Sequence, residues 1–170
     1  MQAIRVHQFG DPSVMKLEKV ADPQPGTGQV VIAVRAVGIN PVDVYIRKGI
    51  YGGREFPFTP GLDCAGVVES VGAGVKRLKV GMRVYTAATI SGAYAEKALA
   101  AETKTFELSE KLSFEEGAGI GTPYSTAYRA LFDRAEAKPA ETVLIHGGSG
   151  AVGNAAIQLA KNHGMIVFAT

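Results

Sequence analysis

Short apolar runs separated by glycine dominate the first 110 residues. The runs at 30–37, 64–71, 83–86 and 94–99 each have a glycine shortly before or directly after them. Short strands with glycine at such intervals are typical of a small barrel or sandwich. The pattern therefore predicts four strands in a β-rich N-terminal domain.

The pattern changes to a helical one near residue 113. Ser113 followed by Glu116 forms a capping box, which predicts a helix start there. Thr122 followed by Pro123 predicts an N-cap with proline at the first helical position. Apolar and aromatic residues then recur at helical spacing as far as Arg134, so a second helix is expected over 123–134.

The last thirty residues have the pattern of one βαβ unit. The continuous apolar run at 142–146 is typical of a strand buried on both faces of a parallel sheet. A helix is expected over 150–163, where apolar residues follow the 3.6-residue period, and Gly164 is expected to end it. A second strand is predicted at 165–168.

A glycine motif lies between the first strand and the helix of this unit. Gly148 to Gly153 fits G-x-G-x-x-G, and Gly147, Gly150 and Gly153 fit a G-x-x-G-x-x-G variant. Such a loop turns tightly, lets backbone approach a pyrophosphate, and offers the N–H groups of a helix start to the anion. The context of strand, loop and helix favours a dinucleotide site. The alternative is a glycine-rich turn that binds nothing.

The choice of dinucleotide depends on an acidic residue about 20 positions beyond the first glycine of the motif. Counting from Gly148, that distance reaches the stretch 168–170, which contains no Asp or Glu. The sequence therefore favours NADP over NAD.

Composition narrows the function classes. The net charge is only +2, which gives no field for attracting nucleic acid or a membrane surface. No apolar run approaches the roughly 20 residues of a membrane-spanning helix, and the first residues do not resemble a signal peptide, so a cytoplasmic protein is expected. Cys64 is the only cysteine, which excludes an intrachain disulfide and a cysteine-cluster zinc site.

Four segments carry a family resemblance, at 38–49, 60–68, 123–131 and the glycine loop. In this order they resemble the medium-chain dehydrogenase/reductase superfamily, and within it the zinc-free NADPH:quinone oxidoreductase (zeta-crystallin-like) branch. The resemblance implies an α/β protein. A GroES-like β-barrel substrate domain over 1–122 would precede an incomplete Rossmann-type nucleotide-binding domain over 123–170.

The resemblance also implies site residues. Asn40, Asp43 and Tyr45 match positions near the nicotinamide and the reacting substrate, with Tyr45 placed to hydrogen-bond the acceptor oxygen. Thr126 matches a position near the nicotinamide. The implied cofactor is NADPH, and the residues implied to hold it are Thr126, Gly147, Gly148, Gly150, Ala151, Val152 and Gly153.

Departures from zinc-dependent alcohol dehydrogenases indicate the chemistry. Asn40 stands where those enzymes have a zinc-ligating cysteine, and Leu62-Asp63 stands where they have a His-Glu pair. No metal is therefore expected, and hydride transfer from NADPH to an activated acceptor, a quinone or a conjugated enone, is implied.

Each candidate has a plainer interpretation. Asn40 would hydrogen-bond only its own turn, and Asp43 would pair with Arg47 on a helix surface. Tyr45 would be a core residue. Cys64 is expected to be an inert buried residue.

Three functions are compatible with these observations. The first is an NADPH-dependent quinone oxidoreductase, and the second is an enone or alkenal double-bond reductase. The third is a truncated, non-catalytic nucleotide-binding module, because the chain resembles only the N-terminal half of the enzyme. An open strand edge at 165–168 predicts self-association of the isolated chain, and a homo-oligomer is expected.

Overall fold

The computed structural model describes all 170 residues. They form two compact units, Met1–Gly121 and Thr122–Thr170.

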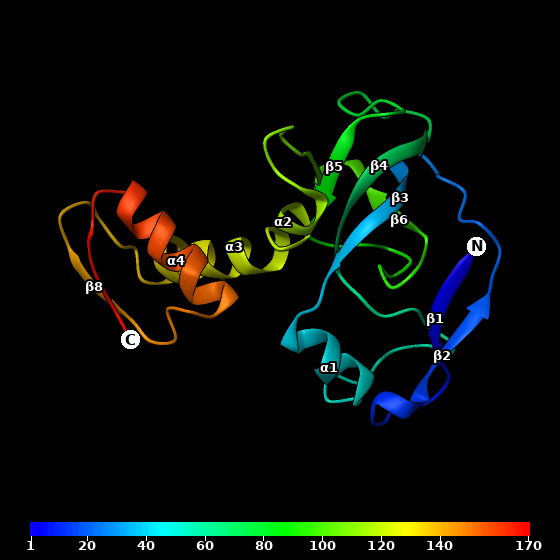
Figure 1. Cartoon of the computed structure of the whole chain (residues 1–170), viewed down its shortest axis with the longest axis horizontal. Helices are drawn as coiled ribbons and strands as arrows, with labels where there is room; N and C mark the ends of the chain where they lie inside the picture. Colours follow the sequence, from blue (N-terminus) through cyan, green and yellow to red (C-terminus); the bar gives the residue numbers. More distant parts are fainter. The chain divides into compact units, whose positions relative to one another are not determined.

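The larger unit is built on a five-stranded antiparallel sheet (Figure 1). Its strand order is β6-β3-β4-β5-β7. Irregularities in the β3–β4 register, between Val31 and Ile32 and between Val34 and Ala36, bend this central pair. The strands are β3 (Gln29–Gly38), β4 (Asp63–Val71), β5 (Arg83–Thr86), β6 (Lys97–Ala101) and β7 (Thr105–Glu107).

A wholly buried apolar cluster fills this unit. Val30, Ile32, Val68 and Val84 are all at most 1% exposed, and Cys64 lies among them at 0%. The strands expected at 30–37, 64–71 and 83–86 are confirmed, because their β-branched residues do supply the core.

The fourth expected strand is displaced. It was predicted at 94–99 but β6 begins only at Lys97. The reason is that Tyr94 and Ala95 pair with the N-terminal strand β1 (Gln2–Val6): the amide of Ile4 donates to the carbonyl of Tyr94 at 2.8 Å. β1 pairs antiparallel with β2 (Met15–Lys19), and the 3₁₀ helix η1 (Pro12–Val14) lies between them.

Two short helices follow strands of this unit. α1 (Pro41–Arg47) begins shortly after β3, and α2 (Phe114–Ala118) has Ser113 as its N-cap. The capping box at α2 is confirmed: Ser113 Oγ accepts the Glu116 amide at 3.1 Å, and Glu116 Oε2 accepts the Ser113 amide at 2.7 Å. A further 3₁₀ helix, η2 (Glu102–Lys104), links β6 to β7.

The smaller unit contains the expected βαβ arrangement. β8 (Thr142–Ile145) and β9 (Ile166–Ala169) are parallel neighbours, and α4 (Ala151–Asn162) connects them. Gly164 ends α4 with a φ of +80°, as expected of a glycine after a helix. α3 (Gly121–Tyr128) continues directly into a π-helical turn, η3 (Arg129–Arg134).

Two expectations for this unit are wrong. α3 begins two residues before Pro123, so Thr122 lies inside the helix rather than at its N-cap. Pro123 is still tolerated there, because an amide in the first turn has no intrahelical acceptor. The sheet is also not buried on both faces, since Leu144 is 57% exposed and Phe168 60% exposed.

Only one face of this small sheet is covered, which explains the exposure of Leu144 and Phe168. Ile145 from β8 packs with Ala155 and Ala160 of α4 and with Leu131 of η3, and no element of this unit covers the opposite face. No helix of the molecule is both long enough and apolar enough to span a bilayer.

Candidate active site

A buried cluster in the larger unit joins Asn40 to two carboxyl groups. The Asn40 side-chain amide donates to Asp63 Oδ2 at 3.0 Å, and its backbone amide donates to Asp43 Oδ2 at 2.8 Å. Asn40 is 8% exposed, Asp43 4% and Asp63 0%. Two carboxyl groups removed from water this completely are costly unless hydrogen-bonded, so Asn40 stabilises both.

Strand register brings these residues together across 23 positions of sequence. Gly38 at the end of β3 lies opposite Asp63 at the start of β4. Asn40, two residues beyond Gly38, is the N-cap of α1, and Asp43 is the third residue of that helix. The side chain of Asp43 therefore reaches back to the Asn40 amide, as acidic residues in a first helical turn commonly do.

Asp43 is electrostatically unusual. Burial raises its pKa above the ordinary aspartate value, and the charge of Asp63 raises it further. Hydrogen bonds from the Asn40 amide, the Tyr94 hydroxyl and the Leu62 amide act in the opposite direction without cancelling the rise. Asp43 Oδ1 is buried and makes no hydrogen bond of good geometry. This carboxyl group therefore holds a proton more readily than an exposed one.

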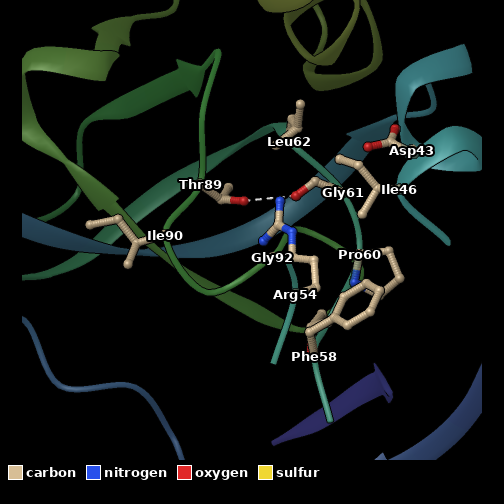
Figure 2. A pocket seen from close by; sticks show the side chains of 11 residues that line it. Asp43, Ile46, Arg54, Phe58, Pro60, Gly61, Leu62, Thr89, Ile90 and Gly92 are labelled. Carbon is tan, nitrogen blue, oxygen red and sulfur yellow. Dashed lines mark hydrogen bonds between the residues drawn. The ribbon is translucent and has the colours of Figure 1, made fainter. Parts of the chain in front are cut away.

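A small cavity lies against Asp43 (Figure 2). The guanidinium of Arg54 reaches into it over the ring of Phe58, 5.8 Å from the ring centroid, and Thr89 Oγ1 donates to the carbonyl of Gly61 at 2.8 Å. Its volume of about 10 Å³ is room for a single water molecule.

Two larger and more apolar cavities adjoin the same cluster. One, of about 120 Å³, is walled by Asp43, Ile39 and Tyr94 among others. The other, of about 250 Å³, shares Ile39 and Tyr94 with it and extends to Ile4 and Ala95. Small-molecule sites are commonly apolar cavities of roughly 300–1,000 Å³ with a few polar groups, so the pair together approaches this range.

The structure groups only two of the three residues expected at the substrate. Asn40 and Asp43 are joined by a hydrogen bond, whereas Tyr45 is 42% exposed with its ring centroid 6.3 Å from that of Tyr51. The plainer interpretations of Asn40, Asp43 and Tyr45 are wrong. Asn40 contacts Asp63 rather than only its own turn, Tyr45 is not a core residue, and Arg47 donates to the carbonyl of Gly10 at 3.2 Å while Asp43 is buried.

The glycine loop of the smaller unit has the backbone that a pyrophosphate site needs. Gly147 has a φ of +72°, which favours glycine. A Cβ on Gly153 would overlap the carbonyl oxygen of Gly147, so only glycine lets α4 start this close to the end of β8. Gly150 is the N-cap of α4 and makes no side-chain cap, which leaves the first amides of the helix free of a side-chain partner.

The other residues expected at the cofactor are accessible. Ala151, Val152 and the loop glycines at 147 and 150 are exposed, so a dinucleotide can reach the N-terminus of α4 without displacing a side chain. These features fit a nucleotide phosphate. Thr126 lies on the exposed side of α3.

Sequence reasoning did not identify Tyr94 as a site residue, and it treated Asp63 only as a departure from a zinc site. A charged residue that opens the apolar run 63–68 was a signal for a buried partner. Tyr94 gave no such signal, because its position follows from the pairing of residues 94–95 with β1. Cys64 is inert as expected, since burial raises its pKa to about 12. No three His, Cys, Asp or Glu side chains converge as metal ligands do.

Comparison with known proteins identifies the family. The alcohol dehydrogenase GroES-like domain family matches residues 26–124, more than half of the chain. The chain belongs to this family. The GroES-like N-terminal fold expected from the four sequence segments is thereby confirmed.

Individual relatives are quinone oxidoreductases. The Sus scrofa quinone oxidoreductase is 54% identical over 172 residues, which cover 100% of this chain and 52% of that protein. The Escherichia coli quinone oxidoreductase, solved with NADPH, superposes with a TM-score of 0.88 at 33% identity, over 99% of this chain and 52% of that one. A mycobacterial protein solved with NADPH superposes with a TM-score of 0.91 at 36% identity, over 99% of this chain and 52% of that one. The chain thus spans about half the length of the relatives it matches, and its resemblance to their N-terminal half is confirmed.

Proposed function

We propose that the chain is part of a zinc-independent, NADPH-dependent quinone oxidoreductase. The observation that carries the proposal is the loop at 147–153, in which a positive-φ glycine and a glycine without room for a Cβ hold the start of α4 open to an anion. The relatives solved with NADPH support the choice of cofactor. The absence of an acidic residue at 168–170 favours NADPH over NADH.

Each part of the chain has a role in this proposal. The amides at 150–153 bind the pyrophosphate, and Thr126 contacts the nicotinamide. When bound, NADPH supplies a hydride to the acceptor. Asn40 holds Asp43 and Asp63 in place, and Tyr45 orients the acceptor oxygen from its exposed position on α1.

A quinone is the proposed acceptor. The reaction is proposed to be zinc-independent because Asn40 stands where zinc-dependent relatives place a cysteine ligand. Quinone oxidoreductases are 51–54% identical to the whole chain, which supports a quinone over an enone. The proposal includes a cytoplasmic location and a homo-oligomeric state. Sedimentation measures the oligomeric state directly.

An assay of NADPH oxidation with a panel of quinones and enones tests the function. We expect turnover with quinones, and we expect NADPH to be preferred to NADH. Gly153→Ala should lose NADPH binding, whereas Ser149→Ala, which changes an exposed residue of the same loop, should keep it. Turnover with enones alone would identify a double-bond reductase instead. Binding of NADPH without oxidation by any acceptor would indicate the non-catalytic nucleotide-binding module.

A further inference from the structure

Tyr94 is held rigidly beside the carboxyl cluster. Its amide donates to the carbonyl of Pro60 at 3.0 Å, and its carbonyl accepts the amide of Ile4 at 2.8 Å. Its ring lies on Gly61, whose φ is +96° and where a Cβ would overlap the ring. Backbone and ring are both fixed, so the position of the hydroxyl group is set by the fold.

The Tyr94 hydroxyl connects Asp43 to the apolar cavities. It donates to Asp43 Oδ2 over 3.5 Å, and Tyr94 lines both the 120 Å³ and the 250 Å³ cavities. Asp43 also lines the water-sized cavity, as Figure 2 shows. Asp43 is therefore shared by the water-sized cavity and the 120 Å³ apolar cavity, and Tyr94 is shared by the two apolar cavities.

We propose that Asp43 and Tyr94 deliver the proton that quinone reduction consumes, with Tyr94 facing the acceptor in the apolar cavities and Asp43 resupplying Tyr94. This inference rests on the proposed function. It adds Tyr94 to the site and gives Asp43 a chemical role.

The chemistry balances as follows. The nicotinamide is oxidised and the quinone reduced by one hydride, which carries two electrons and one proton, so a hydroquinone needs one further proton. The Tyr94 O–H bond breaks as the new O–H bond of the hydroquinone forms. The Asp43 O–H bond breaks as that of Tyr94 is restored, with the contact between the two reversed in direction. Asp43 regains its proton from bulk solvent, and the 10 Å³ cavity has room for one water molecule to relay it.

The groups that face this pair set the pKa values of both members. Burial and the charge of Asp63 on β4 raise the pKa of Asp43, so Asp43 holds a proton more readily than an exposed carboxyl group. Burial and the charge of Asp43 raise the pKa of Tyr94 to about 12, against which Arg47 on α1 acts. Tyr94 is therefore a weak acid by itself, and it gives up its proton to the acceptor only as Asp43 supplies another. Arg54 is the remaining charged group at the small cavity.

Tyr94→Phe is the direct test, because it removes one hydroxyl group and keeps the ring on Gly61. We expect kcat with a quinone to fall about 100-fold, the solvent deuterium isotope effect on kcat to change, and the KM for NADPH to stay within twofold. Tyr85→Phe is the matched control, since Tyr85 is a half-buried tyrosine of β5 whose ring packs on Phe106. Equal kcat in both variants would overturn the relay.

A second measurement needs no turnover. In an NMR titration of ¹³C-labelled aspartate carboxyl groups, Asp43 should titrate above the ordinary value of about 3.9. Tyr94→Phe should raise that midpoint, because a hydrogen bond to the carboxylate is lost, and Asp63→Asn should lower it, because a nearby negative charge is lost. An ordinary midpoint that neither variant moves would contradict the relay. A responsive Asp43 in a protein that reduces no quinone would instead count against the proposed function.

Discussion

The two units bury their sheets to very different degrees. In Met1–Gly121 the central strands β3 and β4 meet over Ile32, Cys64 and Val68, all at most 1% exposed. In Thr122–Thr170 the outward face of β8 and β9 carries Leu144 and Phe168, each more than half exposed. Parallel sheets are normally covered on both faces. The larger unit is thus closed around its own core, while the smaller unit presents a packed face and an open one.

This difference also separates the settings of the two candidate sites. The carboxyl cluster around Asn40 lies in a buried setting where desolvation tunes a pKa, whereas the glycine loop is an exposed backbone surface. A proton-handling group needs the former setting, and a large anionic cofactor needs the latter. Matched substitutions in the two units should therefore differ in their effects.

Core truncation should distinguish the two sheets most strongly. Ile32→Ala removes a wholly buried side chain and should lower the free energy of unfolding by about 4 kcal/mol. Leu144→Ala, at a 57% exposed position, should change it by less than about 0.5 kcal/mol. Urea unfolding followed by circular dichroism measures both. A comparable loss in the two variants would mean that the open face of β8 is covered in solution.

A second pair of variants compares two glycines, one in each unit, at which an added Cβ would overlap a backbone carbonyl group. In Gly66→Ala the new Cβ would overlap the carbonyl oxygen of Ala33 in the larger unit, and in Gly153→Ala that of Gly147 in the smaller one. Each should cost about 2–3 kcal/mol. Hydrogen exchange should show β3 and β4 losing protection in the first variant, and only α4, β8 and β9 in the second.

Gly81→Ala is the control for this pair. Gly81 differs from Gly66 and Gly153 in having a positive φ, of +89°, and a Cβ there meets nothing within 4 Å. The expected cost is only about 1 kcal/mol, from the backbone conformation alone. If Gly81→Ala were as damaging as the other two, close contact would not be the cause of their loss.

Helix starts give a smaller contrast. α2 is capped by the Ser113 and Glu116 side chains, while α4 starts at Gly150 with no side-chain cap. Ser113→Ala should destabilise the larger unit by about 1 kcal/mol without changing NADPH affinity. Thermal melting and an NADPH titration of the variant check the two parts. Weakened NADPH binding in Ser113→Ala would contradict the proposal that the loop before α4 is the part of the chain that binds the cofactor.

The smallest effect is the pH dependence contributed by Asp43. Its pKa is raised in the fold, so the unfolded chain releases this proton first as pH rises above about 3.9. The contribution to stability is therefore complete below that range and is lost as pH rises through the raised pKa. Asp43→Asn should lose less stability than the wild type as the pH rises above about 4. A steeper loss in the variant would contradict a raised pKa.

Local signals predicted much of the fold. The capping box at Ser113, the strand cores at 30–37 and 64–71, and the βαβ unit around the glycine loop depend on short-range patterns that the structure retains. The start of β6, and the pairing of residues 94–95 with β1, depend on contacts across 90 residues that no local pattern encodes. The sequence likewise did not predict the open face of β8, because an apolar run does not show whether a partner covers it.

The candidate site was predictable to the same extent. The loop glycines follow from a motif with a physical reason for each glycine, and Asn40 and Asp43 follow from a resemblance. Tyr94 enters only through the β1 pairing and the backbone of Gly61, so only the structure brings it to Asp43. The exposure of Tyr45 was also beyond the sequence, since a short helical pattern does not show which of its positions the rest of the fold covers.

An NMR titration of the ¹⁵N-labelled chain with NADPH tests the central claim most directly. The account predicts saturable shifts of the amides of Gly150, Ala151, Val152 and Gly153, weaker shifts with NADH, and no shifts at these amides in Gly153→Ala. Ser149→Ala should behave like the wild type. Loop amides that stay unmoved at saturating NADPH, in a folded chain, would contradict it.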